Sequence, residues 1–186
     1  MFGEYCMETL NGNRYWFALY TKPRQEFKAE LQLRAVGLEV YLPKITRLKQ
    51  WSDRKKKITE PLINSYIFVN CVEKERLLAL EQDAIVRCVF YCGRPARIPD
   101  DQMQNFIDFI KDEEDYFVVN GIVKGTKVLI KDGPFTGVTG VVIEDPCGRT
   151  VAVSIELLNR TVVARLHDNV KLDVLSPQKE LNEISN

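Results

Sequence analysis

The stretch KGTKVLIKDGPFTGVTGVV, residues 124–142, decides how the second half of this chain is expected to fold. Val128 and Ile130 lie two residues apart, so they share one face of a strand. The Asp-Gly-Pro-Phe run that follows has the composition of a turn. Gly137 and Gly140 come next, and glycines so closely spaced indicate positive φ angles or close backbone approach. Taken by itself, the stretch predicts a β-hairpin with glycine turns.

The rest of this half consists of short β runs separated by turn residues, with no good helical period. Such runs within about fifty residues predict a small all-β barrel. The 124–142 stretch resembles the KOW motif, which marks SH3-like barrels in transcription and ribosomal proteins. The resemblance implies a KOW domain over residues 124–175, preceded by a linker at 112–123. The predicted strands are residues 126–131, 140–144, 150–155, 161–166 and 170–175.

The first half opens with a strand followed by a helix. Residues 15–20 are dense in strand-forming side chains. The Thr-Lys-Pro run at 21–23 favours a helix start, with threonine as cap and proline in the first turn. Phe27, Leu31 and Ala35 then repeat every four residues, which predicts the apolar face of an amphipathic helix.

Further strands and helices alternate up to residue 111, which predicts an α+β domain with an antiparallel sheet over residues 15–111. We expect strands at 38–42, 62–69 and 85–91 and a helix at 73–82. A last helix begins after Pro99, with acidic residues in its first turn. Its predicted buried stripe is Met103, Phe106, Ile107 and Ile110.

The order of these elements resembles the N-terminal domain of NusG-type transcription elongation factors. The resemblance lies in the strand 16–20, a strand ending at Pro43, a basic hairpin, the PLINSYIFV run at 61–69 and the GRPARIP run at 93–99. With the KOW motif, it covers nearly the whole chain. It implies a factor that binds RNA polymerase and suppresses pausing and termination.

One segment departs from the family pattern. Residues 63–66 read Ile-Asn-Ser-Tyr where the housekeeping factor usually has Phe-Pro-Gly-Tyr. The chain also lacks the long acidic-loop insertions of some members. These departures favour a specialised paralog of the RfaH or UpxY type, which acts on long exopolysaccharide operons. A housekeeping NusG acting with Rho is the alternative.

The resemblance also implies which residues contact the polymerase. Tyr20, Ile63 and Tyr66 fall on the positions of the family's patch for the clamp helices, and Val89 extends it. Aromatic anchors carry much of the energy of such interfaces. The alternative is that all four belong to the core of the sheet. The opposite side of the polymerase cleft would be contacted from about residues 76–78, which do not match the polar triplet of the RfaH type.

Residues 44–57 carry seven Lys or Arg residues against one Asp, which predicts a basic hairpin. Cationic side chains bind phosphates with the release of counterions, and a tryptophan among them offers a stacking surface for an unpaired base. The resemblance implies contact with upstream DNA or the non-template strand. The alternative is a solvated hairpin whose lysines protect an edge strand. The predicted contacts are Lys44, Arg47, Lys49, Trp51, Arg54, Lys55, Lys56 and Lys57.

The KOW domain of the family recruits either Rho or a ribosomal protein. The candidate contacts here are Phe135, Asn159 and Arg160, although Phe135 also suits the interior of a barrel. A general RNA-binding module of the KOW type, or a structural adaptor without nucleic-acid contact, are rival functions. An RNA-binding module would have a basic second half, whereas residues 124–175 hold seven basic and six acidic residues.

Composition excludes several other classes of protein. The 26 basic and 26 acidic residues balance, so the chain as a whole is not a basic coat for nucleic acid or membrane. No apolar run approaches the roughly 20 residues of a membrane helix, and no signal peptide is evident. Five irregularly spaced cysteines favour free thiols in the cytoplasm. The chain has one histidine and no catalytic motif, and the cysteine pair at 88 and 92 is too small for a zinc site. We therefore expect no enzyme activity, metal or cofactor. We also expect a monomer.

Overall fold

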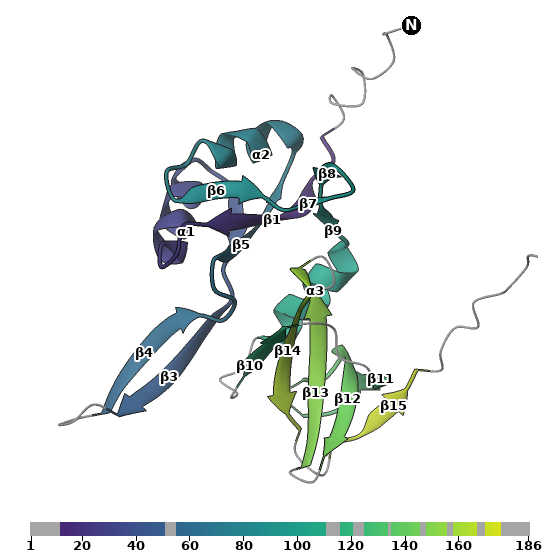
Figure 1. The fold of residues 1–186 in the computed structure, drawn as a ribbon. Coiled ribbons are helices and arrows are strands. Elements are labelled where there is room, and N and C mark those ends of the chain that lie inside the picture. The colour runs from purple at the N-terminus through teal and green to yellow at the C-terminus, as the bar shows by residue number, and fades with distance from the viewer. Residues whose placement is uncertain are drawn as a thin grey trace, which may run out of the picture. The chain divides into compact units, whose positions relative to one another are not determined.

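The structure, a computed structural model, describes residues 12–50, 55–110, 116–120, 125–133, 135–145, 148–155, 158–166 and 170–175. The chain divides into two compact units, residues 1–113 and 114–186. The first is an α+β unit and the second is all-β, which confirms the predicted fold class (Figure 1).

The first unit is built on a five-stranded antiparallel sheet with the order β2-β5-β1-β6, in which β9 also pairs with β1. Two short hairpins, β3–β4 and β7–β8, lie outside this sheet. The elements in chain order are β1 (Tyr15–Thr21), α1 (Glu26–Ala35), β2 (Glu39–Tyr41), β3 (Lys44–Gln50), β4 (Lys55–Pro61), β5 (Tyr66–Cys71), α2 (Glu73–Leu80), β6 (Ile85–Cys88), β7 (Phe90–Tyr91), β8 (Arg94–Pro95), β9 (Arg97–Ile98) and α3 (Asp100–Phe109).

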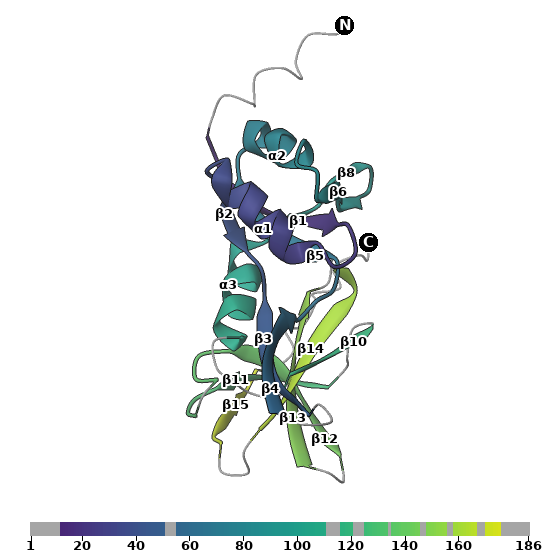
Figure 2. The ribbon, with the colours of Figure 1, turned by 90° about the vertical axis from the view of Figure 1, so that its left-hand side faces the viewer.

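Strand β1 supplies core residues to both faces of this sheet, because its side chains alternate. Phe17 and Leu19 are fully buried in a cluster that includes Ala29 and Leu33 of α1. Figure 2 shows α1 lying across β1 and β5. On the other face, the Phe68 ring of β5 lies 5.9 Å from that of Phe106 on α3. One face is therefore covered by α1 and α2, and part of the other is covered by α3.

The predicted apolar face of α1 is wrong. Phe27 and Leu31 are exposed, Leu31 by 70%, and the buried side chains are Glu26, Ala29, Glu30 and Leu33. Strand β1 continues through residue 21, so the helix starts at Glu26 and not at the Thr-Lys-Pro run. The two glutamates can be buried because each of them accepts hydrogen bonds.

The last helix is confirmed, but its buried stripe is shifted. Met103 and Phe106 are buried as predicted. The third buried residue is Phe109, while Ile107 and Ile110 are half-buried. Pro99 precedes the helix as its N-cap residue, which agrees with the start expected there.

The second unit is a six-stranded antiparallel sheet with the order β10-β14-β13-β12-β11-β15. All five predicted strands are present. A further strand, β10, pairs with β14 and lies within residues 112–123, the predicted linker. The elements are β10 (Phe117–Asn120), β11 (Thr126–Ile130), β12 (Thr139–Asp145), β13 (Gly148–Ile155), β14 (Arg160–Arg165) and β15 (Leu172–Val174).

The glycines of the 124–142 stretch have the two roles expected of them. Gly137 adopts a φ of +87°, which allows the turn that follows Phe135. Gly140 lies where a Cβ atom would stand 2.5 Å from Cγ2 of Val151, so only glycine lets β12 approach β13 so closely. The motif thus encodes both the turn and the packing of the barrel.

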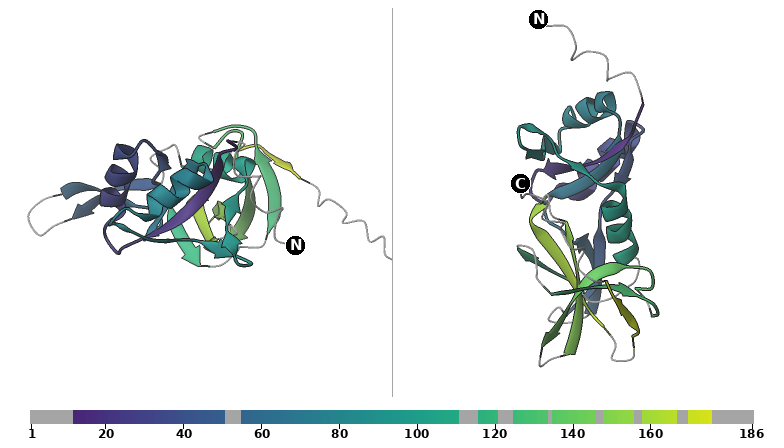
Figure 3. Two further views of the ribbon diagram at one scale, coloured as in Figure 1. Left: turned by 90° about the horizontal axis from the view of Figure 1, so that it is seen from above. Right: turned by 90° about the vertical axis from the view of Figure 1, so that its right-hand side faces the viewer.

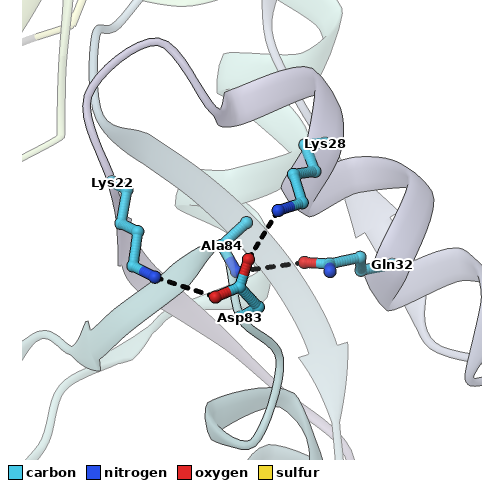
Figure 4. A network of polar contacts seen from close by, with 5 residues as sticks. All are labelled: Lys22, Lys28, Gln32, Asp83 and Ala84. Carbon is cyan, nitrogen blue, oxygen red and sulfur yellow. Dashed lines mark hydrogen bonds and ion pairs between the residues drawn. The ribbon is translucent and has the colours of Figure 1, made fainter.

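An ion-pair network holds the start of α1 against the turn before β6 (Figure 4). Asp83 accepts from Lys22 at 2.9 Å and from Lys28 at 2.5 Å. Next to it, the Ala84 N–H donates to Oε1 of Gln32 at 3.0 Å. The hydrogen bonds from Lys28 and Lys22 lower the pKa of Asp83 from 3.8 to about 2.

No helix among the residues described is long and apolar enough to span a membrane.

We expect Asp83→Asn to remove a pH-dependent part of the stability. A carboxylate with a lowered pKa stabilises the fold above its ordinary value of 3.8 and loses this contribution as the pH falls towards about 2. The free energy of unfolding, measured with urea from pH 2 to pH 7, should therefore differ between the variant and the wild type mainly at the upper end. Because Asp83 is exposed, 1 M salt should shrink the difference. A difference that is equally large at pH 2 and pH 7 would contradict this role.

Candidate functional site

Two tyrosines form a pair on the face of the first sheet that α3 covers only in part. Tyr20 of β1 and Tyr66 of β5 are directly opposite in the antiparallel register. Their ring centroids are 4.9 Å apart and the rings are nearly perpendicular. Phe68, which contacts α3, lies on the same face two residues further along β5. Both tyrosines are half-buried, so each combines an anchored ring with an accessible edge.

The other two residues predicted for this surface differ in exposure. Val89 follows β6 directly and is half-buried, and its N–H donates to the carbonyl of Ala18 at 2.9 Å. It therefore lies alongside β1 and can border the tyrosine pair. Ile63 is only 2% exposed and belongs to the core. The expectation that Ile63 contacts a partner is corrected, because its side chain is already buried.

The loop between β4 and β5 is locked against α1. The Ser65 N–H donates to Oε1 of the buried Glu26 at 2.8 Å, and the Thr21 N–H donates to the Ser65 carbonyl at 2.9 Å. Ser65 has a φ of +63°, in the left-handed region that glycine adopts without strain. It occupies the position at which the family's usual run has glycine. Ser65 thus adopts, immediately before Tyr66, a conformation that favours glycine.

The basic hairpin is present and projects from the sheet of the first unit (Figures 1 and 3). Hydroxyls of Thr46 and Thr59 are 3.0 Å apart across it. Lys44, at its root, lies 2.7 Å from Glu30 and over the ring of Phe27, so its charge is already neutralised within the unit. Arg47 is 4.0 Å from Glu60. These two cations are engaged in the protein itself.

Exposed cations continue along the hairpin beyond these two residues. Lys55, Lys56 and Lys57 are exposed on β4. Backbone pairing sets Lys56 opposite Lys49 of β3. Trp51 and Arg54 lie outside the residues that the structure describes.

The predicted contact residues of the second unit fall into two groups. Phe135 is 2% exposed, and its ring lies 6.3 Å from that of Tyr116, so it fills the barrel and is corrected from contact to core. Asn159 is exposed with a φ of +50°, and the half-buried Arg160 donates to its carbonyl. Of the contact residues predicted in this unit, Asn159 and Arg160 remain candidates for a partner.

The described cysteines differ in their exposure. Cys88 is buried and Cys92 is exposed in the β7–β8 turn. Burial raises the pKa of the Cys71 thiol to about 12, which keeps it protonated and unreactive. Within the described part of the chain, no three His, Cys, Asp or Glu residues are grouped as metal ligands.

Arg87 is a surface residue that the sequence reading missed. It lies opposite Tyr20 on β6, with its guanidinium carbon 5.7 Å from the centre of the tyrosine ring. The register shifts between Tyr20 and Thr21 through a bulge in β6, which leaves Val86 unpaired. Bulges depend on three-dimensional packing, so no pattern in the sequence could have indicated it.

The contact between Glu26 and Ser65 predicts an ordered series of stabilities. Glu26→Ala leaves the Ser65 N–H without its acceptor and should lower the free energy of unfolding by about 1–3 kcal/mol. Glu26→Gln keeps an oxygen acceptor and should cost less. Ser65→Gly relieves the left-handed strain and should cost nothing. Urea unfolding measures each value, with the exposed Asn64→Ala as control. Equal stability of Glu26→Ala and Glu26→Gln would show that the hydrogen bond is unimportant.

Comparisons with known proteins identify the family. A family model described as "Transcription termination factor nusG" matches residues 14–107, half of the chain. A structure titled for domain interaction in Thermotoga maritima NusG is 22% identical, with 83% of this chain and 93% of that chain covered and a TM-score of 0.46. A structure of the MjSpt4:Spt5 complex is 16% identical, covering 86% and 98%, with a TM-score of 0.32. Because both TM-scores are below 0.5, the assignment of the chain to a family rests on the family model alone. A search of curated protein sequences gave no match. The chain therefore belongs to the NusG family of transcription factors.

Proposed function

We propose that this protein is a bacterial, cytoplasmic elongation factor that binds the clamp helices of RNA polymerase and suppresses pausing and termination. The observation that carries the proposal is the half-buried pair of Tyr20 and Tyr66. Val89 borders it. The resemblance to the NusG N-terminal domain assigns these positions to the polymerase. Ile63 is not included, because it is buried.

The tyrosine pair has the physical properties of an interface anchor. Each ring is fixed by its neighbour, so little side-chain entropy remains to be lost on binding. Tyrosine joins a large apolar surface to a hydroxyl that can remain at the rim. Residues of this type dominate binding energy in protein interfaces. An apolar helix of the polymerase is a partner that fits this surface.

Binding would favour the closed clamp only if the factor binds that state more tightly than the open one. The resemblance implies a second contact across the cleft from about residues 76–78. Arg76 is excluded from it, because it is buried, bonded to Glu73 and stacked over Phe17. Leu77 and Leu78 are exposed on α2, so any contact there is apolar.

The β3–β4 hairpin would supply the contact with upstream DNA or the non-template strand. Lys55, Lys56 and Lys57 are exposed on one strand of a projecting arm. Such an arm gives sequence-independent affinity that falls with salt. The family resemblance adds Lys49, Trp51 and Arg54 to the proposed contact. Lys44 is not counted, since Glu30 already neutralises it.

The second unit would recruit a ribosomal protein or Rho through the turn at Asn159 and Arg160.

We propose the specialised paralog type, serving a subset of operons such as exopolysaccharide operons. The reason is that Asn64 and Ser65 stand where the housekeeping factor usually has Pro and Gly. Run-off transcription across a Rho-dependent terminator separates the two roles. Read-through supports the specialised role, and earlier release supports the housekeeping role.

We expect Tyr20→Ala and Tyr66→Ala each to weaken binding to core RNA polymerase at least tenfold, because each removes a hot-spot ring and its partner's support. Read-through at a pause site should fall in parallel. Tyr91→Ala is the matched control, since Tyr91 is exposed on β7 outside the pair. Circular dichroism checks the fold. Unchanged affinity in both folded variants would overturn polymerase binding by this surface.

Replacing Lys55, Lys56 and Lys57 together by Gln should weaken binding to an elongation complex but not to polymerase without nucleic acid. Three lost phosphate contacts should reduce the slope of log affinity against log salt by about two to three. Fluorescence anisotropy at several salt concentrations measures both quantities. If the slope stays at the wild-type value, the hairpin does not bind DNA.

A further inference from the structure

Arg87 continues the tyrosine pair into a row across three adjacent strands. Tyr66 of β5 faces Tyr20 of β1, and Tyr20 faces Arg87 of β6. Facing residues of neighbouring strands share one face of a sheet. The ring centroids of Tyr20 and Tyr66 are 4.9 Å apart, and the guanidinium carbon of Arg87 lies 5.7 Å from the centre of the Tyr20 ring. The three side chains therefore lie together. Arg87 is the exposed member of the row.

The bulge in β6 is what places Arg87 on this face. Ile85 and Cys88 are both buried, although they are three residues apart and a regular strand would send them to opposite faces. The register skips Val86, so that Thr21 faces Ile85 and Tyr20 faces Arg87. Bulges commonly re-aim a side chain at the edge of a sheet. The core thus accepts both apolar residues while the arginine is directed beside Tyr20.

The charge of Arg87 is not neutralised within the described part of the chain. Its one contact there is the stacking on Tyr20, and no carboxylate lies within ion-pair distance. By contrast, Arg34 and Arg76 are paired with Glu30 and Glu73. Stacking holds the planar guanidinium in place and leaves its N–H groups for another acceptor.

We propose that Arg87 is a specificity-determining residue of the tyrosine surface, and that it binds a carboxylate on the protein that covers Tyr20 and Tyr66. This proposal rests on the proposed polymerase contact and adds the chemistry of the partner: an apolar ridge with an Asp or Glu beside it. A carboxylate accepts two parallel hydrogen bonds from a guanidinium. The preordered ring–guanidinium stack lowers the entropic cost of forming them.

The test measures the affinity of the full chain for core RNA polymerase without nucleic acid. Arg87→Glu should weaken binding at least tenfold, and Arg87→Lys, which keeps the charge but not the planar fork, should weaken it by a smaller factor. Lys127→Glu, an exposed cation of the second unit, makes the same change in net charge and should have no effect. If the charge-reversed variant Arg87→Glu does not fold, Arg87→Gln is measured in its place and should also weaken binding.

A charge-reversal scan of acidic residues on the clamp helices then identifies the partner group. One Glu→Lys or Asp→Lys substitution should restore the binding of Arg87→Glu while weakening that of the wild type. Arg87 variants within twofold of wild type, alongside tyrosine variants that lose binding, would overturn this inference alone. Loss of binding only when DNA is present would assign Arg87 to a phosphate and also overturn it. If the tyrosine variants bind normally, the proposed function itself fails.

Discussion

The pairing of β1 with β5 on one side and with β6 on the other is the constraint on which the first unit depends. Because side chains alternate along β1, Phe17 and Leu19 must enter the core beneath α1 whenever Tyr20 faces the opposite side. A shift of the β1 pairing register by one residue would move Tyr20 to the core face and Phe17 to the opposite face. The same hydrophobic burial that fixes the register therefore fixes the position of the candidate interface.

A second constraint acts on the loop that leads into Tyr66. The buried carboxylate of Glu26 accepts a hydrogen bond from the Ser65 N–H at 2.8 Å, and the same bond holds Ser65 in its left-handed conformation. The buried carboxylate and the strained backbone thus stabilise each other. Position 65 can dispense with glycine, and the loop still delivers Tyr66 opposite Tyr20.

The sequence predicted those features that depend on local patterns. Closely spaced glycines indicated the barrel turns, and the density of lysine and arginine indicated the hairpin. It failed where tertiary contacts decide. Phe27 and Leu31 have helical spacing, yet the α1 face that turns inward carries Glu26 and Glu30, because distant donors at residues 44 and 65 satisfy them. Ile63 and Phe135 resembled surface anchors but fill interior space. Arg87 reaches its place through a bulge that has no sequence signature.

The different environments of the thiols have a practical consequence. Cys71 and Cys88 are enclosed by the sheet and α2, and burial raises the pKa of both, so alkylating reagents that need a thiolate meet inert groups there. Cys92, by contrast, stands in the open at the tip of the β7–β8 turn, three residues after Val89. Among the described cysteines it is the natural attachment point for a fluorophore. A dye attached to Cys92 would report on a partner that binds the neighbouring surface around Val89 and the tyrosine pair. The dye itself would stay outside the hydrophobic interior.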